Sequence, residues 1–162
     1  MPVAIRRAEP AEFGRVGDLC VAAYAAFLSS DAAQYEEALR DAATRAEAAE
    51  LLVAADGDAL LGTVTFVPDG GPLGEIAGPD EAEFRMLAVD PAAQGLGVGT
   101  ALTRHVLDAS RAAGKHGVVC SSLDAMRAAH RIYERLGFRR VPARDWSPVP
   151  GVDLIAFATR LG

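Results

Sequence analysis

The chain has 162 residues, 51% hydrophobic and 23% charged, which is typical of a single globular domain, here taken as residues 1–162. No apolar run reaches about 18 residues, so a transmembrane helix is excluded. The net charge of −6 argues against nucleic-acid binding. Cys20 and Cys120 form no CxxC pair, which argues against a disulfide framework or a metal site. Because the N-terminus also lacks the apolar stretch of a signal peptide, we expect a cytoplasmic location.

The hydrophobic pattern predicts an α/β protein (an α+β mixed sheet) with six to seven strands and about four helices. In chain order, we expect a strand at 3–5, helices at 9–27 and 31–50, strands at 51–55 and 60–67, a loop at 68–80, a strand at 81–89, a helix at 100–113, a strand at 118–123, a helix at 125–136, a strand at 138–141, a loop at 142–152 and a strand at 154–158. Asp31 and Asp124 are candidate N-caps, and Gly114 and Gly137 are candidate helix stops. A central mixed, twisted sheet with helices on both faces buries these elements.

The two halves of the chain differ in charge. Residues 1–84 carry sixteen acidic and five basic side chains, whereas residues 85–162 carry six acidic and eleven basic ones. The first half is therefore expected to attract cations, and the second half is suited to a phosphorylated ligand.

One segment joins a strand to a helix through three alternating glycines, Gly95, Gly97 and Gly99. Glycines at the start of a helix let backbone N–H groups approach a ligand closely, and the positive end of the helix dipole favours a phosphate. A Walker A loop would need a Gly-Lys-Ser/Thr ending, and a dinucleotide fingerprint would need a glycine at Thr100. A strand-to-helix connection that binds no ligand is the alternative interpretation.

Residues 94–99, Gln-Gly-Leu-Gly-Val-Gly, resemble the Q/R-x-x-G-x-G/A pattern of the GNAT superfamily of acyl-CoA-dependent N-acetyltransferases. The preceding strand ending at residues 87–91 is similar to that family, and so are residues 129–138 with their A-x-x-x-Y-x-x-x-G-F spacing. The predicted order of elements also agrees with the family's fold over nearly the whole chain. The resemblance implies a GNAT-like fold and acetyl-CoA as cosubstrate, without a metal ion.

The resemblance also implies where the cofactor binds. In the family, the strand before the glycine loop splays from its parallel neighbour, and the pantetheine arm of CoA pairs with that strand in the gap. Backbone N–H groups of the glycine loop and the first helical turn hold the pyrophosphate. The cofactor-binding residues implied are Leu87, Ala88, Val89, Gln94, Gly95, Leu96, Gly97, Val98, Gly99 and Thr100. Arg104 is a further phosphate candidate or else a solvated helix position.

Two catalytic residues follow from the same resemblance. Tyr133 resembles the family tyrosine that protonates the departing thiolate, and a core tyrosine is the alternative. Attack on a thioester needs a neutral amine, so a base is required, and Glu83 stands where several members carry a strand glutamate in that role. An ion pair with Arg85 on the same strand face is the alternative, and Glu75 and the acids of the early helices are other candidate bases. Met126 stands where many members carry an asparagine that contacts CoA.

We therefore expect an N-acetyltransferase that passes the acetyl group to a primary amine by direct attack in a ternary complex. The acceptor is expected to be a small-molecule or peptide amine, cationic in view of the acidic first half, and bound by the first two helices, loop 68–80 and residues 144–146. We expect no nucleic-acid or membrane partner, with a homodimer as one assembly to test. A non-catalytic acyl-CoA-binding or sensing module is the alternative function, and a nucleotide-dependent oxidoreductase is disfavoured by Thr100.

Overall fold

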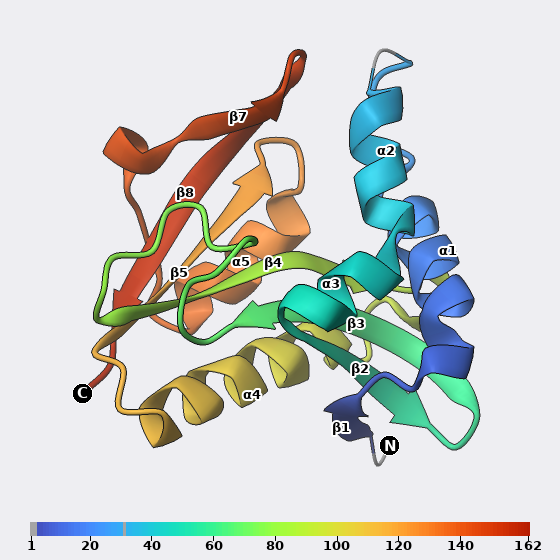
Figure 1. Ribbon diagram of the computed structural model, residues 1–162, viewed down its shortest axis with the longest axis horizontal. Helices are drawn as coiled ribbons and strands as arrows, with labels where there is room; N and C mark the ends of the chain where they lie inside the picture. Colours follow the sequence, from blue (N-terminus) through green and yellow to red (C-terminus); the bar gives the residue numbers. More distant parts are fainter. Residues whose placement is uncertain (1–2, 31) are drawn as a thin grey trace.

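The computed structural model describes residues 3–30 and 32–162, and within them the chain forms one eight-stranded sheet with five α-helices and three 3₁₀ helices (Figure 1). The elements are β1 (Ala4–Arg7), η1 (Pro10–Glu12), α1 (Phe13–Tyr24), α2 (Ala33–Arg40), α3 (Ala42–Ala48), β2 (Glu50–Asp56), β3 (Ala59–Val67), β4 (Glu81–Val89), η2 (Pro91–Ala93), α4 (Val98–Ala112), β5 (Gly117–Leu123), α5 (Arg127–Arg135), β6 (Arg139–Arg140), η3 (Pro142–Arg144), β7 (Trp146–Val149) and β8 (Val152–Arg160). The predicted fold class is confirmed, with one strand and one helix more than expected.

The sheet is mixed, in the order β1-β2-β3-β4-β5-β8-β6, and β7 pairs with β8 beside this path. Among the described strands, β4 and β5 form the one parallel pair, and α4 provides the crossover that such a pair requires. The strands predicted at 51–55 and 60–67 form an antiparallel hairpin, in which β2 pairs with β3 from Glu50 opposite Phe66 to Asp56 opposite Ala59.

Helices cover both faces of the sheet and create two hydrophobic clusters. Helices α1 to α3 pack on one face, in a cluster that includes Leu39, Val53 and Met86. Helices α4 and α5 pack on the other, in a cluster that includes Phe84 and Leu102. In Figure 1, β2 and β3 lie between α3 above and α4 below. The two faces therefore give β4 a different environment on each side.

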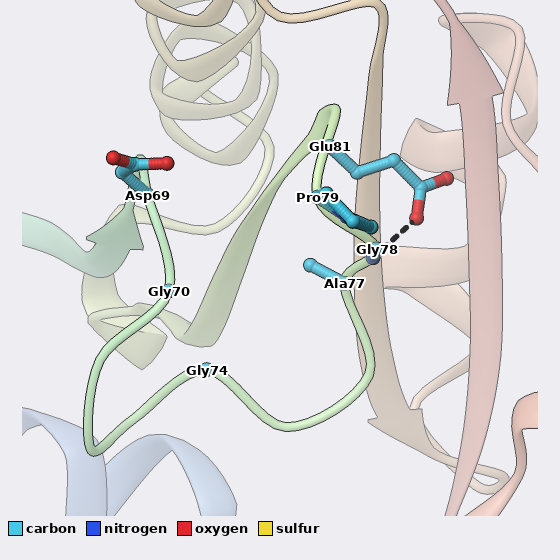
Figure 2. Close-up of a pocket in the computed structure, with 7 residues that line it drawn as sticks. All are labelled: Asp69, Gly70, Gly74, Ala77, Gly78, Pro79 and Glu81. Carbon is cyan, nitrogen blue, oxygen red and sulfur yellow. Dashed lines mark hydrogen bonds between the residues drawn. The ribbon is translucent and has the colours of Figure 1, made fainter.

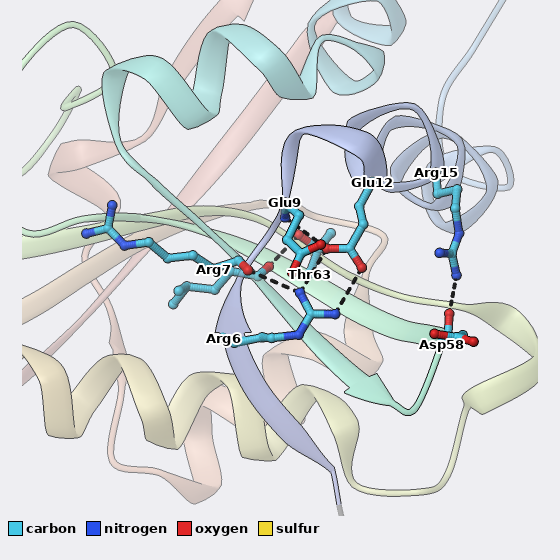
Figure 3. Close-up of polar contacts among 8 residues, drawn as sticks. Arg6, Arg7, Glu9, Glu12, Arg15, Asp58 and Thr63 are labelled. Atoms are coloured by element: carbon cyan, nitrogen blue, oxygen red, sulfur yellow. Dashed lines mark hydrogen bonds and ion pairs between the residues drawn. The ribbon is translucent and has the colours of Figure 1, made fainter.

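The start of the chain is fixed to the sheet by ion pairs and hydrogen bonds (Figure 3). Arg6 on β1 donates two hydrogen bonds, of 2.8 and 2.9 Å, to the carboxylate of Glu12. Glu12 also accepts the backbone N–H of Glu9 at 2.9 Å, and the pKa of Glu12 falls to about 2, chiefly because of Arg6. Arg15 on α1 donates to the carbonyl of Asp58 in the β2–β3 turn. These contacts set the position of α1 on the sheet.

The prediction of a single helix over residues 31–50 is wrong, because this segment forms α2 and α3 with a break at Asp41. The Asp41 carboxylate accepts the backbone N–H of Thr44 at 3.2 Å and its hydroxyl at 2.7 Å, so it caps the second helix. The end of α2 lies against Gly17 of α1, where a Cβ atom would come within 2.4 Å of the Arg40 carbonyl oxygen. The predicted N-cap Asp31 lies outside the described residues.

The first predicted helix, 9–27, is also shorter in the structure. It begins with the 3₁₀ helix η1 at Pro10, and α1 ends at Tyr24. Phe27, the last residue of the predicted helix, lies beyond α1 and is 40% exposed.

The predicted helix at 125–136 begins two residues later, at Arg127. Asp124 does not cap it, because Met126 takes the N-cap position and no side chain bonds to the helix start there. Gly114 and Gly137 follow α4 and α5 with φ of +77° and +95°, so both predicted helix stops are confirmed.

The C-terminal region contains a strand that the sequence did not predict. Strand β7 lies inside the expected loop 142–152 and pairs with β8, with Trp146 opposite Leu154. Strand propensity did not predict β7 because Pro148 lies within it. Proline is nevertheless tolerated at a sheet edge. The predicted strand at 138–141 is only the two-residue β6, whereas β8 is longer than expected at both ends.

Candidate active site

Strands β4 and β5 separate half-way along β4. Their parallel pairing runs from Glu81 opposite Gly117 to Phe84 opposite Cys120, although β4 continues to Val89. The backbone of the last five residues of β4 is therefore not paired with β5. The gap that the family resemblance implies is present in the structure.

The separation begins at a β-bulge. Met86 is buried with a φ of 52°, unusual for a residue other than glycine, and the register with β3 shifts opposite it. Such a conformation costs on the order of 1–3 kcal/mol, so the surrounding structure must hold it in place. The bulge reverses the alternation of side chains. Phe84 and Leu87 both join the α4–α5 cluster, while Met86 and Ala88 face the α1–α3 helices.

Two carbonyl groups of β4 are turned away from β3 and meet side chains of the chain itself. The Tyr24 hydroxyl of α1 donates to the Leu87 carbonyl at 3.3 Å, and Gln94 Nε2 donates to the Val89 carbonyl at 3.4 Å. Both contacts are long for hydrogen bonds. The resemblance implies that the backbone of Leu87 and Val89 pairs with pantetheine. In the structure, the carbonyl groups of these two residues form only long hydrogen bonds within the chain. Sequence reasoning did not single out Tyr24, since its only signal was a place on the apolar side of a helix.

A narrow cavity of about 190 Å³ lies at this gap. Its lining combines the end of β4 with α1 and α5: Ala23, Phe27, Leu87, Ala88, Val89, Gln94, Met126, Ala128, Ala129 and Ile132. Four of the predicted cofactor-binding residues are in this set. The lining is largely apolar, which suits a slender arm such as pantetheine.

A second cavity of about 350 Å³ adjoins the first, because Val89, Gln94, Ala128 and Ile132 line both. The further residues of its lining are Ala93, Gly95, Gly97, Val98, Gly99, Thr100, Arg131 and Arg135. All predicted cofactor-binding residues except Leu96 line one or both cavities. Leu96 is 55% exposed, so its side chain points into solvent.

The glycine loop opens the N-terminus of α4 towards this second cavity. Gly97 occupies the N-cap position with a φ of +79°, and no side chain caps the helix in the described chain. The N–H groups of the first helical turn, at Val98, Gly99 and Thr100, therefore have no partner within the helix. A Cβ on Gly99 would lie 2.9 Å from Ile132 Cδ1, so this glycine lets α4 approach α5 closely. Helix start and cavity together form a site suited to an anion.

Two arginines that sequence reasoning missed add positive charge to the same cavity. Arg131 and Arg135 lie one turn apart on α5 and line the cavity opposite the glycine loop. Within the described residues, neither forms an ion pair. Their spacing of four residues on a predicted helix was the signal available in the sequence. Arg104, the candidate named from the sequence, lines neither cavity.

Tyr133 lies on α5 directly after Ile132. It is only 3% exposed, and its ring packs against Phe84, Phe138 and Phe157 with centroid distances of 5.5 to 5.7 Å. Burial raises the pKa of Tyr133 well above its usual value, with a further contribution from Cys120. The side chain is therefore part of the core, and its hydroxyl remains protonated and able to donate.

Glu83 is fully buried on β4, one residue before the last β4–β5 pair. Its Oε1 accepts three backbone N–H groups of the loop, from Glu75, Ile76 and Ala77, at 2.9 to 3.1 Å. Its Oε2 is buried and has no hydrogen-bond partner among the described residues. Burial raises the pKa of Glu83, although the three amide hydrogen bonds and Arg85 act in the opposite direction. One oxygen thus holds the loop and the other is free.

The ion pair between Glu83 and Arg85, considered above as an alternative, is absent from the described residues. Arg85 instead lies 3.8 Å from Glu75 Oε1 and donates to the Leu73 carbonyl at 3.3 Å. The guanidinium carbon of Arg85 also lies 5.7 Å from the centre of the Trp146 ring on β7. Arg85 therefore joins the loop to β7, and Glu83 is left without an ionic partner.

Loop 68–80 encloses a cavity of its own, of about 420 Å³ (Figure 2). The lining residues are Asp69, Gly70, Gly74, Ala77, Gly78, Pro79 and Glu81. Glu81 Oε1 accepts the Gly78 N–H and a hydrogen bond from Arg144, both at 2.8 Å. None of the predicted catalytic or cofactor-binding residues lines this cavity. The loop contacts the candidate site through its hydrogen bonds to Glu83 and Arg85.

The two cysteines are free and buried, Cys20 in the α1–α3 cluster and Cys120 in the α4–α5 cluster. Burial raises the pKa of both thiols, to about 11 for Cys20. In residues 3–30 and 32–162, no three His, Cys, Asp or Glu side chains are grouped to hold a metal ion, and no helix has the length and apolar character to cross a membrane.

Residues 18–138 match the model of the Acetyltransferase (GNAT) family, and this range includes the gap, the glycine loop and Tyr133. The chain belongs to this family. N-acetylaspartate synthetase of Rattus norvegicus is 34% identical over 100 residues, which are 59% of this chain and 33% of that protein. The match thus takes in about a third of the length of this curated relative.

Solved structures share the GNAT fold over nearly the full chain. PH1933 from Pyrococcus horikoshii OT3 has a TM-score of 0.76 at 17% identity, with 99% of both chains covered. The structure of yncA from Salmonella typhimurium with its cofactor acetyl-CoA has a TM-score of 0.66 at 20% identity, with 100% of this chain and 95% of that chain covered. At these identities the likeness establishes the fold, and the site must be argued from this chain's own residues.

Proposed function

We propose that this GNAT-family chain transfers the acetyl group of acetyl-CoA to a primary amine by direct attack in a ternary complex. The observation that carries the proposal is the gap beside β4. It continues into a cavity formed by the uncapped N-terminus of α4 and two arginines of α5. This combination offers an apolar channel for a thin arm and an anion site at one end, as acetyl-CoA requires.

In this proposal, CoA lies across both cavities. The pyrophosphate is held by the N–H groups of the glycine loop and first turn of α4, and Arg131 and Arg135 supply positive charge from α5. The pantetheine arm lies in the 190 Å³ cavity and replaces the long contacts that Tyr24 and Gln94 make with β4 carbonyls. The structure of yncA with acetyl-CoA supports a cofactor of this kind.

Glu83 is proposed as the base. Its free Oε2 accepts a proton from the ammonium group of the acceptor, directly or through water, and leaves a neutral amine that attacks the thioester carbonyl carbon. A raised pKa suits this role, because it brings the carboxylate closer to the pH at which it must accept a proton. Oε1 meanwhile keeps the loop attached. Glu75 and the acids of the early helices have no comparable free, buried oxygen among the described residues.

Tyr133 is proposed as the acid. As the carbon–sulfur bond breaks, its hydroxyl donates to the departing sulfur of CoA and delivers the proton that forms the free thiol. The raised pKa supports this assignment, since the phenol retains its proton throughout the neutral range. The attacking nitrogen gives up its remaining surplus proton, which restores the phenol directly or through water, so the products are an N-acetyl amide and CoA. The ring of Tyr133 packs in the core while its hydroxyl serves as the acid.

The acceptor is proposed to be a small-molecule or peptide amine. Its cationic character, expected from the acidic first half, is here assigned to the reacting ammonium group. This assignment follows because Glu12, Asp18, Glu36 and Glu50 in that half are already paired with arginines. A relative named N-acetylaspartate synthetase supports an N-acetyl product. A cytoplasmic location and a homodimer remain predictions.

The proposal is tested by steady-state kinetics with acetyl-CoA and a library of amines, with release of free thiol as the signal. Direct attack predicts intersecting double-reciprocal lines, whereas an acetylated enzyme intermediate gives parallel lines and would overturn the proposed mechanism. Calorimetry with CoA measures binding separately. Binding of CoA without turnover on any amine would establish the alternative, a non-catalytic acyl-CoA-binding module.

A further inference from the structure

Arg85 is a nearly buried cation that uses few of its donors. Its side chain is 12% exposed, and the Trp146 indole covers one side of the guanidinium. In the described part of the chain, its contacts are a carbonyl at 3.3 Å and the Glu75 carboxylate at 3.8 Å, both through Nη1. A guanidinium presents five N–H donors in a planar fork that matches a carboxylate. Most of this fork is therefore available.

Arg85 lies on the same strand as the proposed base. Glu83 and Arg85 are two residues apart on one face of β4, about 6.6 Å along the strand. Both precede the bulge at Met86, at the point where the pairing with β5 ends. A carboxylate oxygen that can receive an ammonium group and a guanidinium that can receive a carboxylate thus share one face of β4, close to the end of its pairing with β5.

We propose that the acceptor is a small α-amino acid with a free carboxylate, which binds Arg85 while its amine meets Glu83 Oε2. The inference rests on the proposed function and names its substrate class. An α-amino acid carries its ammonium and carboxylate groups on the same carbon atom, so one small ligand offers a cation to Glu83 and an anion to Arg85. The guanidinium carbon lies 5.7 Å from the centre of the Trp146 ring, and Nη1 makes both polar contacts of Arg85 in the described chain, so the remaining donors can make a bidentate contact with a carboxylate. A polyamine would place a second positive charge at Arg85.

Glu75 occupies the place of this carboxylate when no acceptor is bound. Its side chain is 37% exposed, and its Oε1 is too far from Arg85 Nη1 for a direct hydrogen bond. The backbone N–H of Glu75 is held by Glu83, so the side chain alone must move when an acceptor enters. Removing the charge of Glu75 should therefore favour an anionic acceptor and disfavour a cationic one. The direction of the change in rate on removing this charge therefore distinguishes an anionic acceptor from a cationic one.

The first experiment measures initial rates of thiol release with each of the common L-amino acids and with spermidine. The best amino acid is then compared with its carboxamide and its decarboxylated amine. We expect kcat/KM to be at least tenfold higher for the amino acid than for either analogue, because the analogues leave the buried guanidinium without a partner.

The second experiment uses two variants and a control. Arg85→Gln should lower kcat/KM about 100-fold for the amino acid but less than about threefold for the decarboxylated amine. Glu75→Gln should raise kcat/KM for the amino acid two- to fivefold, mainly through KM. Arg111→Gln is the control, since Arg111 pairs with Asp108 on α4 and lies outside the proposed contact. It should leave the preference for the carboxylate unchanged.

The outcomes separate this inference from the proposed function. If the decarboxylated amine or spermidine reacts faster and Glu75→Gln lowers that rate, acetyl transfer stands and the amino-acid acceptor is wrong. If Arg85→Gln binds CoA normally yet reduces both rates equally, Arg85 supports the loop and does not bind the acceptor. If no amine releases thiol, the proposed function fails and the inference fails with it.

Discussion

The two sides of β4 are built in different ways. On the proposed cofactor side, the end of β4, the glycine loop, α4 and α5 lie between residues 86 and 135, and α1 adds Ala23 and Phe27 to the cavity. On the proposed acceptor side, loop 68–80, Arg85 of β4 and Trp146 of β7 come from distant parts of the sequence. A cofactor common to a family can be bound by a short motif, whereas an acceptor-specific surface can vary segment by segment on the same scaffold.

The electrostatics of the two sides differ as well. Among the described residues, the proposed cofactor side presents backbone N–H groups without helix partners and arginines without acidic partners, which favours an anion. The proposed acceptor side presents charges that are only partly engaged: Glu83 binds the loop through Oε1 alone, and Arg85 lies over the Trp146 ring. Substitutions on the two sides should therefore affect different kinetic steps.

The largest effect is expected on the cofactor side. Gly97→Glu should weaken CoA binding on the order of 100-fold, because it places a carboxylate at the proposed phosphate site and removes the conformational freedom at φ +79°. Calorimetry with CoA measures the change. Gly57→Glu is the matched control, since Gly57 has φ +60° and open space around it but lies in the β2–β3 turn. An equal loss of CoA affinity in both variants would mean that the substitutions act through backbone strain and not at the proposed phosphate site.

The second effect is expected for Tyr133, the proposed acid, which lies between the two sides. Tyr133→Phe should lower kcat on the order of 100-fold while the Kd for CoA stays within about twofold, because the ring still packs and only the proton donor is lost. Stopped-flow or steady-state thiol release gives kcat, and calorimetry gives Kd. An unchanged kcat would assign Tyr133 to packing alone.

A smaller, pH-dependent effect is expected for Glu83→Gln. The variant should lose about tenfold in kcat near pH 7, and the deficit should shrink as the pH approaches the pKa of the acceptor amine, which then arrives neutral. Glutamine retains an oxygen for the loop amides but cannot accept a proton. Glu81→Gln is the control, because Glu81 also accepts a loop N–H. A rate profile parallel to wild type from about pH 6 to pH 9.5 contradicts the base role.

The same variant has an expected effect on stability. Because burial raises the pKa of Glu83, the folded state binds its proton more tightly than the unfolded state does. Stability associated with this group is present below the unfolded pKa and is lost as the pH rises through the folded pKa. Glu83→Gln should therefore gain stability relative to wild type as the pH increases, in urea unfolding at a series of pH values.

The smallest effect is expected away from both sides. Glu12→Gln should lower the free energy of unfolding by about 1 kcal/mol near neutral pH, without changing kcat. The pKa of Glu12 is depressed to about 2, so its stabilisation is present above the unfolded pKa and is lost as the pH falls towards 2. Urea unfolding at several pH values should show the difference between wild type and variant vanish in acid. A change in kcat would link this ion pair to the site.

Sequence reasoning predicted most of the fold from local signals. The hairpin β2–β3, strand β4 and helix α4 follow from alternation, turn residues and three-to-four spacing. The errors occur where a tertiary contact overrides the local pattern. Asp41 breaks a helix whose composition is uniform, and β7 forms across a proline because β8 offers it an edge.

For the site, the sequence by itself predicted the glycine loop of the proposed cofactor side, because glycine spacing and the start of a helix are local properties of one segment. It also placed Glu83 and Arg85 on one face of one strand. Only the tertiary structure decided that Glu83 holds loop 68–80 with one oxygen and keeps the other free, and that Arg85 meets Trp146 and not Glu83. These partners lie far apart in the chain, and packing around β4, not local propensity, brings them together.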